Sequence, residues 1–581
     1  MVSWVLDDIY KPGERERLVG ELRGRVEDFK AYRSKLGDCL STEEFLHILK
    51  EDEELTKVAS RLSAYAGLLS SEDTSDSKRL SHEARISQFC AEAGNETMFF
   101  GLWFRDLSDE KAGEYIRASG PYHYMLERVR AFRRHTLREN EERIINLKDL
   151  TGSEALTRLY DLITNRFTFK VEGRMVSFDE AARLKMSPKR SLRLSAHNAV
   201  LEKYACEEAV LGEIYCNVIR DWANENVRLR NFTTPIAPVN LGNDLPDKVV
   251  EAMLKAIKDN RKIFHRYFRV KAKACGLGKL DRYDIYIPYH KKERKYSFIE
   301  CKKILLSTYK SFDESVYLMG RRMFDEKHVH SELRKNKQRG AFCSSVNKGF
   351  TPYIMLNHVG RLDDLYAMMH EFGHGVHSIA AGGQTELTYQ AGLPLAETAS
   401  IFSEMLLTER LLEELPGEEK PAILLRMLDS QYGSILRQAY FTLFELEAHR
   451  MVGEGASADS LDAFYLKSLK EQFGRIVEVP EIFQEEWKCI QHIYHSPFYC
   501  YCYAFGNLLV LALYGMYKKE GRDFTPKYLK ILSYGGSESP TKILEEAGVD
   551  FNKPGFWKQG LASIQQEIKR LEKIIQDRAE G

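Results

Sequence analysis

Apolar residues recur at three- and four-residue spacing along most of the chain, which is the pattern of amphipathic helices. The pattern runs from about residue 13 to 225, as in EEFLHILKEDEELTKVASRLSAYAGLL, and proline is nearly absent there. Helices of this kind bury their apolar stripes against one another, so we expect antiparallel helix packing. The rhythm changes near Ser187 and Pro188, and we place a boundary there between an N-terminal helical lobe, 1–190, and a second domain, 191–581.

Strand patterns are confined to the middle of the chain. Aromatic and β-branched residues bounded by Gly, Pro and Asn predict strands at 281–289, 340–346 and 352–357. After Asp363 the helical pattern returns and continues almost to the last residue. The sequence therefore predicts a mainly α fold, large and two-lobed, with a small β-sheet embedded among the helices.

Composition and charge narrow the classes of partner. The chain has 581 residues, and Lys+Arg and Asp+Glu both total 85. This balance argues against a bulk attraction to nucleic acid or to an anionic membrane surface. The longest strongly apolar stretch, 507–517, is too short to span a bilayer. We expect neither nucleic acid nor a membrane as a partner.

The cysteines and the first residues indicate the compartment. The ten cysteines are scattered, without the dense spacing of a secreted disulfide scaffold, and we interpret them as reduced thiols. The opening MVSWVLDDIY has no basic region followed by an apolar one, so a signal peptide is not expected. The prediction is a soluble, cytoplasmic protein.

The segment RLDDLYAMMHEFGHGVHSIAAGG carries the chemistry. Asp363 or Asp364 can cap a helix and two glycines can end it, so 365–380 is predicted to be one helix. His370 and His374 lie four residues apart, stacked on one face, where both imidazoles can bind one zinc ion. Glu371 cannot easily bind the same ion but can reach its water, which is the H-E-x-x-H arrangement of a metallopeptidase with Glu371 as general base.

A hydrolytic zinc ion needs a third protein ligand and an open fourth position. The chain lacks the third histidine of H-E-x-x-H-x-x-G-x-x-H, so a carboxylate on a following helix is required. PLAETASIFSEMLLTERLLEEL supplies Glu397, in the first turn of a helix that Pro394 suits. Glu404 shares its face and is a candidate partner for a histidine N–H, with a solvated carboxylate as the alternative. His377 is interpreted as a local hydrogen-bonding residue.

The segment WKCIQHIYHSPFYCYCYAFGNLLVLALYGMY is rich in histidine and tyrosine, and a helix is predicted to begin near Pro497. Tyr499 and Tyr503 are four residues apart and can point the same way. A tyrosine or histidine aimed at the zinc site could stabilise the oxyanion of a tetrahedral intermediate. Aromatic core packing is the alternative.

Taken together, these elements resemble the thimet oligopeptidase and oligoendopeptidase F family, and the oligoendopeptidase F branch most closely. The resemblance covers nearly the whole chain. It is carried by six ordered segments: WVLDDIYKP, the stretch from RNFTTPIAP to DRYDIYIP, RGAFCSSVNKGFTPYIMLNHVG, HEFGH with LAETAS, HSPFYCYCYAFG, and YGGSESPTKILEEAGVD.

The resemblance implies a helical fold of two lobes around a deep narrow channel with zinc on its floor, the catalytic domain at 191–581, and short unstructured peptides as substrates. It implies one Zn²⁺ on His370, His374 and Glu397, with Glu371 as base. It also implies that a histidine and tyrosines of the later segment act on the substrate carbonyl. Carried over by position, these are His492 and Tyr501 first, then Tyr499 and Tyr503.

The sequence thus predicts a zinc endopeptidase that hydrolyses internal bonds of short peptides. Two alternatives stay open: an intracellular zinc carboxypeptidase, which also uses H-E-x-x-H with a distant glutamate, and a non-catalytic helical scaffold that only binds peptides. The intact ligand set and base weigh against the scaffold. Whether the chain is a monomer or a homodimer is not predicted.

Overall fold

The structure of the chain is a computed structural model that describes residues 2–37, 39–289 and 294–580. It is mainly helical, as predicted, and divides into two compact units. Each unit is assembled from three separate stretches of chain. The boundary predicted after residue 190 falls at the beginning of a helix inside one unit and stays a prediction.

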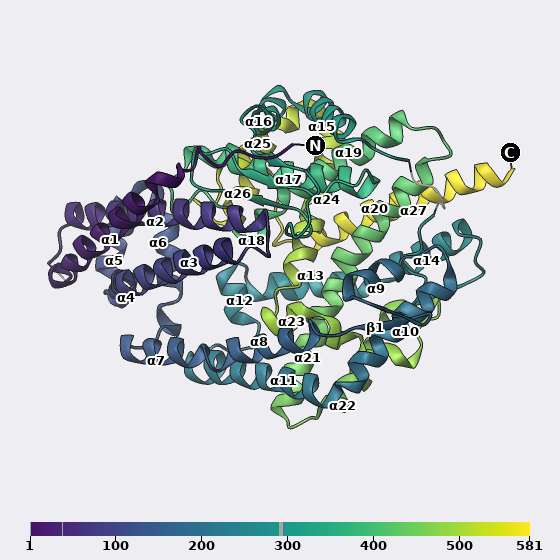
Figure 1. Ribbon diagram of the computed structural model, residues 1–581, viewed down its shortest axis with the longest axis horizontal. Coiled ribbons are helices and arrows are strands. Elements are labelled where there is room, and N and C mark those ends of the chain that lie inside the picture. The colour runs from purple at the N-terminus through teal and green to yellow at the C-terminus, as the bar shows by residue number, and fades with distance from the viewer. Residues whose placement is uncertain (1, 38, 290–293, 581) are drawn as a thin grey trace. The chain divides into compact units, whose positions relative to one another are not determined.

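Unit 1 consists of 1–133, 293–410 and 513–550. Figure 1 shows three of its long helices, α1, α2 and α3, packed side by side. The helices of this unit are α1 Arg15–Ala31, α2 Thr42–Ser71, α3 Ser77–Thr97, α4 Phe99–Asp106, α5 Asp109–Ala118, α6 His123–Ala131, α15 Phe298–Phe312, α16 Glu314–Asp325, α17 Leu362–Ala380, α18 Leu393–Ala396, α25 Thr525–Ser533 and α26 Pro540–Glu546.

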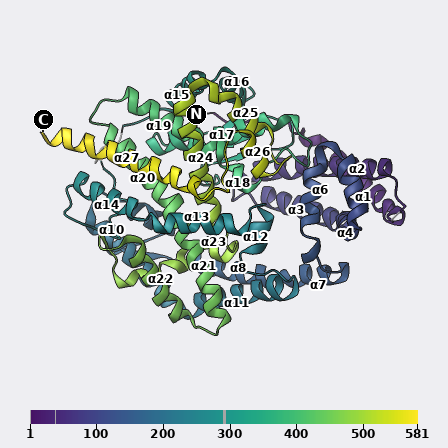
Figure 2. The ribbon, with the colours of Figure 1, turned by 180° about the vertical axis from the view of Figure 1, so that it is seen from behind.

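Unit 2 consists of 134–292, 411–512 and 551–581. In Figure 2, α27 runs beside α20 and α13 of the same unit. Two helices, α19 Thr398–Glu414 and α24 Tyr501–Glu520, hold residues of both units. The helices of unit 2 are α7 Glu139–Asp149, α8 Ser153–Thr164, α9 Phe178–Leu184, α10 Arg190–Cys206, α11 Glu208–Trp222, α12 Ala237–Gly242, α13 Asp247–Asp259, α14 Lys262–Ala274, α20 Lys420–Gln431, α21 Gln438–Gly453, α22 Ala458–Phe473, α23 Gln491–His495 and α27 Pro554–Glu580.

Local sequence explains where the long helices begin and what they bury. Ser41 caps α2 by accepting from the backbone N–H of Glu44, and the Glu44 carboxylate accepts from the Ser41 backbone in return. One face of α2 then buries Phe45, Leu49 and Leu62 in the core of unit 1. Packing of such stripes, rather than helix propensity alone, stabilises helices in water.

A small sheet in unit 1 confirms two of the three strand predictions. Its strands are β4 Val329–His330, β6 Tyr353–Met355 and β5 Phe342–Ser344, in that order. β4 pairs with β6 in parallel, and β5 pairs with β6 antiparallel, with Cys343 opposite Ile354. The sheet lies against α17, which contacts both β5 and β6.

The third strand prediction, 281–289, is wrong beyond its first residue. Only Leu280–Asp281 forms a strand, β3, which pairs in parallel with β7 Val477–Glu478, and turns follow it. Buried ion pairs in this segment compete with the backbone hydrogen bonds that a longer strand would make. The carboxylate of Asp284 is buried and pairs with Arg193, and Arg282 pairs with Glu486. The remaining strands, β1 Phe169–Val171 and β2 Arg174–Val176, form a hairpin in unit 2.

Two further observations concern the cysteines and the lengths of the helices. All ten cysteines lie in the described part of the chain and are free thiols. Within the described ranges, the helices nowhere combine the length and apolarity that crossing a membrane requires.

Candidate metal centre

The helix α17 places two histidines on one face. It spans Leu362–Ala380 and includes the whole predicted helix, 365–380. At its beginning the carboxylate of Asp364 accepts hydrogen bonds from the backbone N–H groups of Arg361 and Val359, at 2.9 and 2.8 Å. This satisfies donors that an open helix end leaves unpaired and fixes the first turn. His370 and His374 follow one turn apart, with their ring centroids 4.8 Å from each other.

Glu397 lies at the junction between α18 and α19, directly after the short helix that has Pro394 in its first turn. Its carboxylate accepts a hydrogen bond from the Ser400 hydroxyl at 2.8 Å, which fixes its orientation. Glycine at position 373 allows α19 to approach α17. A Cβ atom there would stand 2.5 Å from the carbonyl oxygen of Ala399, closer than real Cβ contacts allow. The glycine of H-E-F-G-H therefore sets the distance between the histidine helix and the glutamate.

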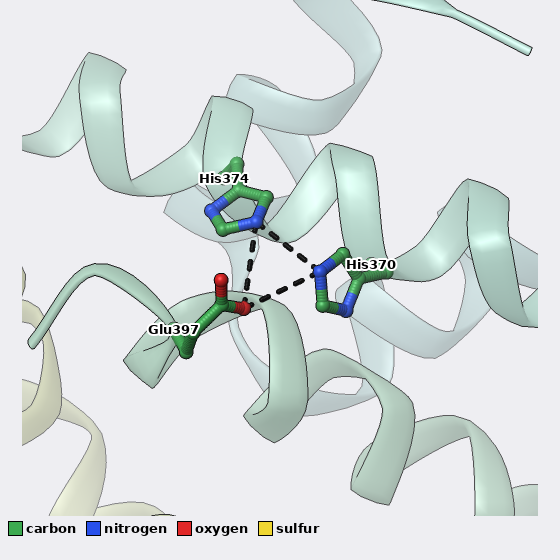
Figure 3. Close-up of side chains that lie close together, drawn as sticks. All are labelled: His370, His374 and Glu397. Carbon is green, nitrogen blue, oxygen red and sulfur yellow. Dashed lines mark hydrogen bonds and ion pairs between the residues drawn. The ribbon is translucent and has the colours of Figure 1, made fainter. Parts of the chain in front are cut away.

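The three predicted ligands converge on one point, as Figure 3 shows. The Nε2 atoms of His370 and His374 are 3.2 Å apart, and Oε2 of Glu397 lies 3.3 and 3.6 Å from them. Four ligands about 2.05 Å from a tetrahedral zinc ion stand roughly 3.3 Å from one another. The spacing and the chemistry of this donor set fit one zinc ion, with a fourth position for water or substrate.

Neighbouring groups hold the ligand rings in orientation. Nδ1 of His370 lies 2.8 Å from Oε1 of Glu404. Because the carboxylate accepts, Nδ1 carries the proton and Nε2 keeps its lone pair for a metal. His374 and His377 both hydrogen-bond to the backbone of Ala396, the residue before Glu397. His377 thus makes a local hydrogen bond, as interpreted from the sequence.

The electrostatics of the site favour a bound cation. Burial lowers the pKa of His370, but the carboxylates of Glu397 and Glu404 outweigh it and raise this pKa to about 10. Burial alone would raise the pKa of Glu397. The hydrogen bond from His370 and the charges of the two histidines outweigh this effect and lower the pKa of Glu397 to about 2. Two carboxylates around an imidazole pair create a negative potential in a poorly solvated place, which a divalent cation relieves.

Glu371 lies next to this centre but is not one of the three converging ligands. Its side chain is buried, and burial raises its pKa to about 7. The carboxylate hydrogen-bonds to the backbone of Cys343 in β5, which ties the base to the sheet. It lines a cavity of about 390 Å³, together with Ala341, Phe342, Cys343, Ser345, His374, His377, Ser378, Tyr389, Gln390, Ala391 and Ala396.

A second group of carboxylates, in unit 2, resembles a metal site only by composition. Glu208, Asp462 and Glu485 bring carboxylate oxygens close together. The ammonium group of Lys488, fully buried, lies 2.7 Å from Asp462, 2.5 Å from Glu485 and 3.8 Å from Glu208. The lysine supplies the positive charge that buried carboxylates require, so this group is an ion-pair network.

The structure brings together three of the four residues predicted from the tyrosine-rich segment. In unit 2, the rings of His492 and Tyr499 are parallel, with centroids 6.0 Å apart. Tyr503 is edge-on to both, and its hydroxyl lies 3.4 Å from Nε2 of His492. His492 is exposed and the two tyrosines are half-buried. We call these three residues the aromatic cluster.

Tyr501 lies elsewhere. Its side chain is fully buried, and its hydroxyl accepts a hydrogen bond from the side-chain amide of Asn243 at 2.8 Å. Burial raises the pKa of this phenol. Tyr499 lies in the turn before α24, and Tyr501 and Tyr503, two residues apart on that helix, point to different sides of it. The placement of Tyr501 therefore favours the alternative that the sequence left open for this segment, core packing.

Comparison with known proteins identifies the class. The pattern described as "Peptidase family M3" matches residues 183–563, more than half of the chain. The chain belongs to peptidase family M3. A second pattern, described as "Oligopeptidase F", matches residues 104–169 of this M3 peptidase. The predicted resemblance and the prediction of a metallopeptidase are confirmed.

Relatives of this M3 peptidase match over nearly its whole length. Oligopeptidase PepF of Bacillus subtilis is 24% identical over 99% of this chain and 87% of its own. The chromosomal oligoendopeptidase F of Lactococcus lactis subsp. cremoris is 26% identical over 92% of this chain and 91% of its own. The crystal structure of oligoendopeptidase-F from Enterococcus faecium has the same fold, with a TM-score of 0.72 at 21% identity, covering 99% of this chain and all of that one.

Sequence reasoning missed several residues that line the cavity beside the candidate metal centre. Tyr389 and Gln390 line the cavity from the segment that leads to α18, and Ser345 and Ser378 hydrogen-bond to each other at its wall. These residue types occur throughout the chain and carry no motif of their own. The signal that could have found Tyr389 and Gln390 is their position, a few residues ahead of Glu397.

Proposed function

We propose that this M3 peptidase is a zinc-dependent endopeptidase that hydrolyses internal bonds of short, unstructured peptides. The observation that carries the proposal is the convergence of His370, His374 and Glu397, with Glu371 beside them at the wall of a cavity. The names of the relatives, oligopeptidase and oligoendopeptidase, support the substrate class. The deep channel implied by the resemblance stays a prediction.

The mechanism follows from what each residue can hold or move. His370, His374 and Glu397 would hold the metal, and the hydrogen bond between His370 and Glu404 keeps the first ring in its binding tautomer. When bound there, zinc would supply Lewis-acid chemistry, polarising the scissile carbonyl and making the attacking water more acidic. Glu371 accepts the proton of the attacking water and passes it to the leaving amine. A buried carboxyl whose pKa lies near 7 suits both transfers.

The donor to the developing oxyanion is proposed to come from the aromatic cluster. His492, Tyr499 and Tyr503 offer an N–H and two hydroxyl groups, and such donors stabilise a tetrahedral intermediate. The family resemblance also implied Tyr501 for this role. We propose that its buried hydroxyl serves packing and that Tyr503 is the first choice for contact with the substrate.

A metal assay and product mapping test the proposal together. Purified enzyme is expected to hold about one zinc per chain and to lose activity with a chelator, regaining it with zinc. Peptides blocked at both ends should be cut at internal bonds. Release of single C-terminal residues, with no cut in blocked peptides, would favour a carboxypeptidase. Binding of peptides without any cleavage by zinc-loaded protein would favour the non-catalytic scaffold.

The remaining expectations stay predictions. A cytoplasmic location agrees with ten free thiols, and secretion of the native protein would contradict it. Whether the chain acts as a monomer or a homodimer can be measured by sedimentation of the full chain.

A further inference from the structure

The turn between α23 and α24 has an unusual backbone. Phe498, in this turn, has a φ of +60°, in the left-handed region that bulky residues rarely adopt. Its side chain is fully buried. The helix predicted to begin near Pro497 therefore begins only at Tyr501. A conformation of this kind persists only where the surroundings impose it, and such residues concentrate at functional sites.

Two residues of α21 contact Phe498. Glu445 is fully buried, and its Oε1 accepts a hydrogen bond from the backbone N–H of Phe498 at 2.6 Å. His449 follows one helical turn later, and its ring centroid lies 4.6 Å from that of Phe498. Because residues i and i+4 of a helix share a face, α21 holds the backbone and the ring of Phe498 together. We call Glu445 and His449 the clamp.

The stability of the core alone does not explain why the clamp contains a buried carboxyl group. Among the described residues, Oε2 of Glu445 has no hydrogen-bond partner, and no ion pair joins Glu445 to a cation. Burial of a carboxyl group in apolar surroundings is costly. Burial also raises the pKa of Glu445 to about 8, so the group is held largely uncharged at neutral pH. What this buried carboxyl group provides is the hydrogen bond to the backbone of Phe498.

The held turn directly precedes the aromatic cluster. Tyr499 is the next residue, and its backbone N–H donates to the Ser496 carbonyl at 3.1 Å. Its ring lies parallel to that of His492, on the other side of the turn. Neighbouring Cα atoms are joined at a fixed distance of about 3.8 Å, so a change of φ at Phe498 moves Tyr499 relative to His492.

We propose that Glu445, assisted by His449, is a positioning residue: it holds Phe498 in the left-handed conformation that sets His492, Tyr499 and Tyr503 in their mutual geometry. The inference rests on the proposed function, because it assigns the aromatic cluster to the substrate. Glu445 itself touches neither metal nor substrate in this role. Its effect is on kcat, since displacement of a donor by about 1 Å can cost about a hundredfold in rate.

A double-mutant cycle with zinc-loaded, full-length enzyme tests the proposal. Glu445→Leu removes the acceptor, and kcat is expected to fall about ten- to a hundredfold. Glu445→Gln keeps an amide oxygen as acceptor and should restore kcat to within about threefold of wild type. In a Tyr503→Phe background, Glu445→Leu should lower kcat by less than about threefold, because the hydroxyl donor that it displaces is already lost.

Each outcome decides between the two proposals. An equal fall in kcat in both backgrounds means that Glu445 acts through general stability, and the positioning role is wrong. No effect of Tyr503→Phe on kcat means that the first-choice donor of the aromatic cluster does not serve the reaction; the part of the cluster in the proposed function then fails, and the positioning role fails with it. If Glu445→Leu does not fold, His449→Leu replaces it in the same cycle with the same expectations, because it removes the ring that covers Phe498.

Discussion

Nδ1 of His370 donates a hydrogen bond to Oε1 of Glu404 on α19, at 2.8 Å, while Nε2 of the same ring faces His374 and Glu397. The bond decides which nitrogen is available to a metal, since a ring whose proton sat on Nε2 could not bind one. It also joins α17 to α19 at the site. The metal centre therefore depends on how these two helices pack.

Glu404→Gln should weaken zinc binding about 10- to 100-fold, because loss of the carboxylate frees the orientation and tautomer of His370. Competition with a chelator of known affinity measures the change. Glu413→Gln, at an exposed position of the same helix, is the matched control and should bind zinc as wild type does. If wild type and both variants bind zinc with equal affinity, Glu404 does not contribute to the metal centre.

Glu371→Gln should retain zinc and lose activity by about 10²- to 10⁴-fold, because the amide keeps the shape of the side chain but cannot accept a proton. Metal content and kcat are measured on the same preparation. The zinc content is the internal control, since a loss of metal would explain inactivity in another way. Wild-type turnover in the zinc-loaded variant would show that Glu371 is not the base.

Gly373→Ala should destabilise the protein by about 1–3 kcal/mol and impair metal binding, because the new methyl group meets the Ala399 backbone at 2.5 Å and forces α19 away. Thermal unfolding and zinc content report the two effects. Gly382→Ala is the matched control, because a Cβ atom there has no atom within 4 Å. The packing argument fails if both variants unfold and bind zinc alike.

Tyr503→Phe should affect kcat, whereas Tyr501→Phe should affect stability. Removal of the Tyr503 hydroxyl should lower kcat about 10²-fold with little effect on stability, if this phenol assists the oxyanion. Removal of the Tyr501 hydroxyl leaves the Asn243 amide with a poorer partner and should cost about 0.5–1.5 kcal/mol of stability, with kcat nearly unchanged. Steady-state kinetics and thermal unfolding of both variants separate the roles, and the reverse pattern would restore Tyr501 as the donor.

Glu445 should make stability depend on pH. Burial raises its pKa from 4.5 to about 8, so the folded chain keeps a proton that the unfolded chain releases in this interval. Its contribution is complete below about pH 4.5 and is lost as the pH rises through about 8. Denaturant midpoints of wild type should therefore fall relative to Glu445→Gln between about pH 5 and pH 8.5. Glu454→Gln, exposed after α21, is the control, and a constant difference would contradict the assignment.

Short-range patterns determined much of this protein. The helical periodicity predicted the fold class, and the four-residue spacing of His370 and His374 placed both rings on one face of α17 without reference to any tertiary contact. These properties depend on backbone geometry within a few residues. The strand prediction at 281–289 is wrong for the complementary reason, because buried ion pairs to Arg193 and Glu486, remote in sequence, determine that segment.

Only the tertiary structure decided which remote groups meet. The sequence proposed Glu397 and Glu404, but the approach of α19 to α17 at Gly373 determines their distances to the histidines. Likewise, the sequence ranked Tyr501 with His492, whereas the left-handed turn at Phe498, held by Glu445, sets which tyrosines face His492. Residues many positions apart are brought together by packing of whole helices, and local sequence patterns carry no measure of that packing.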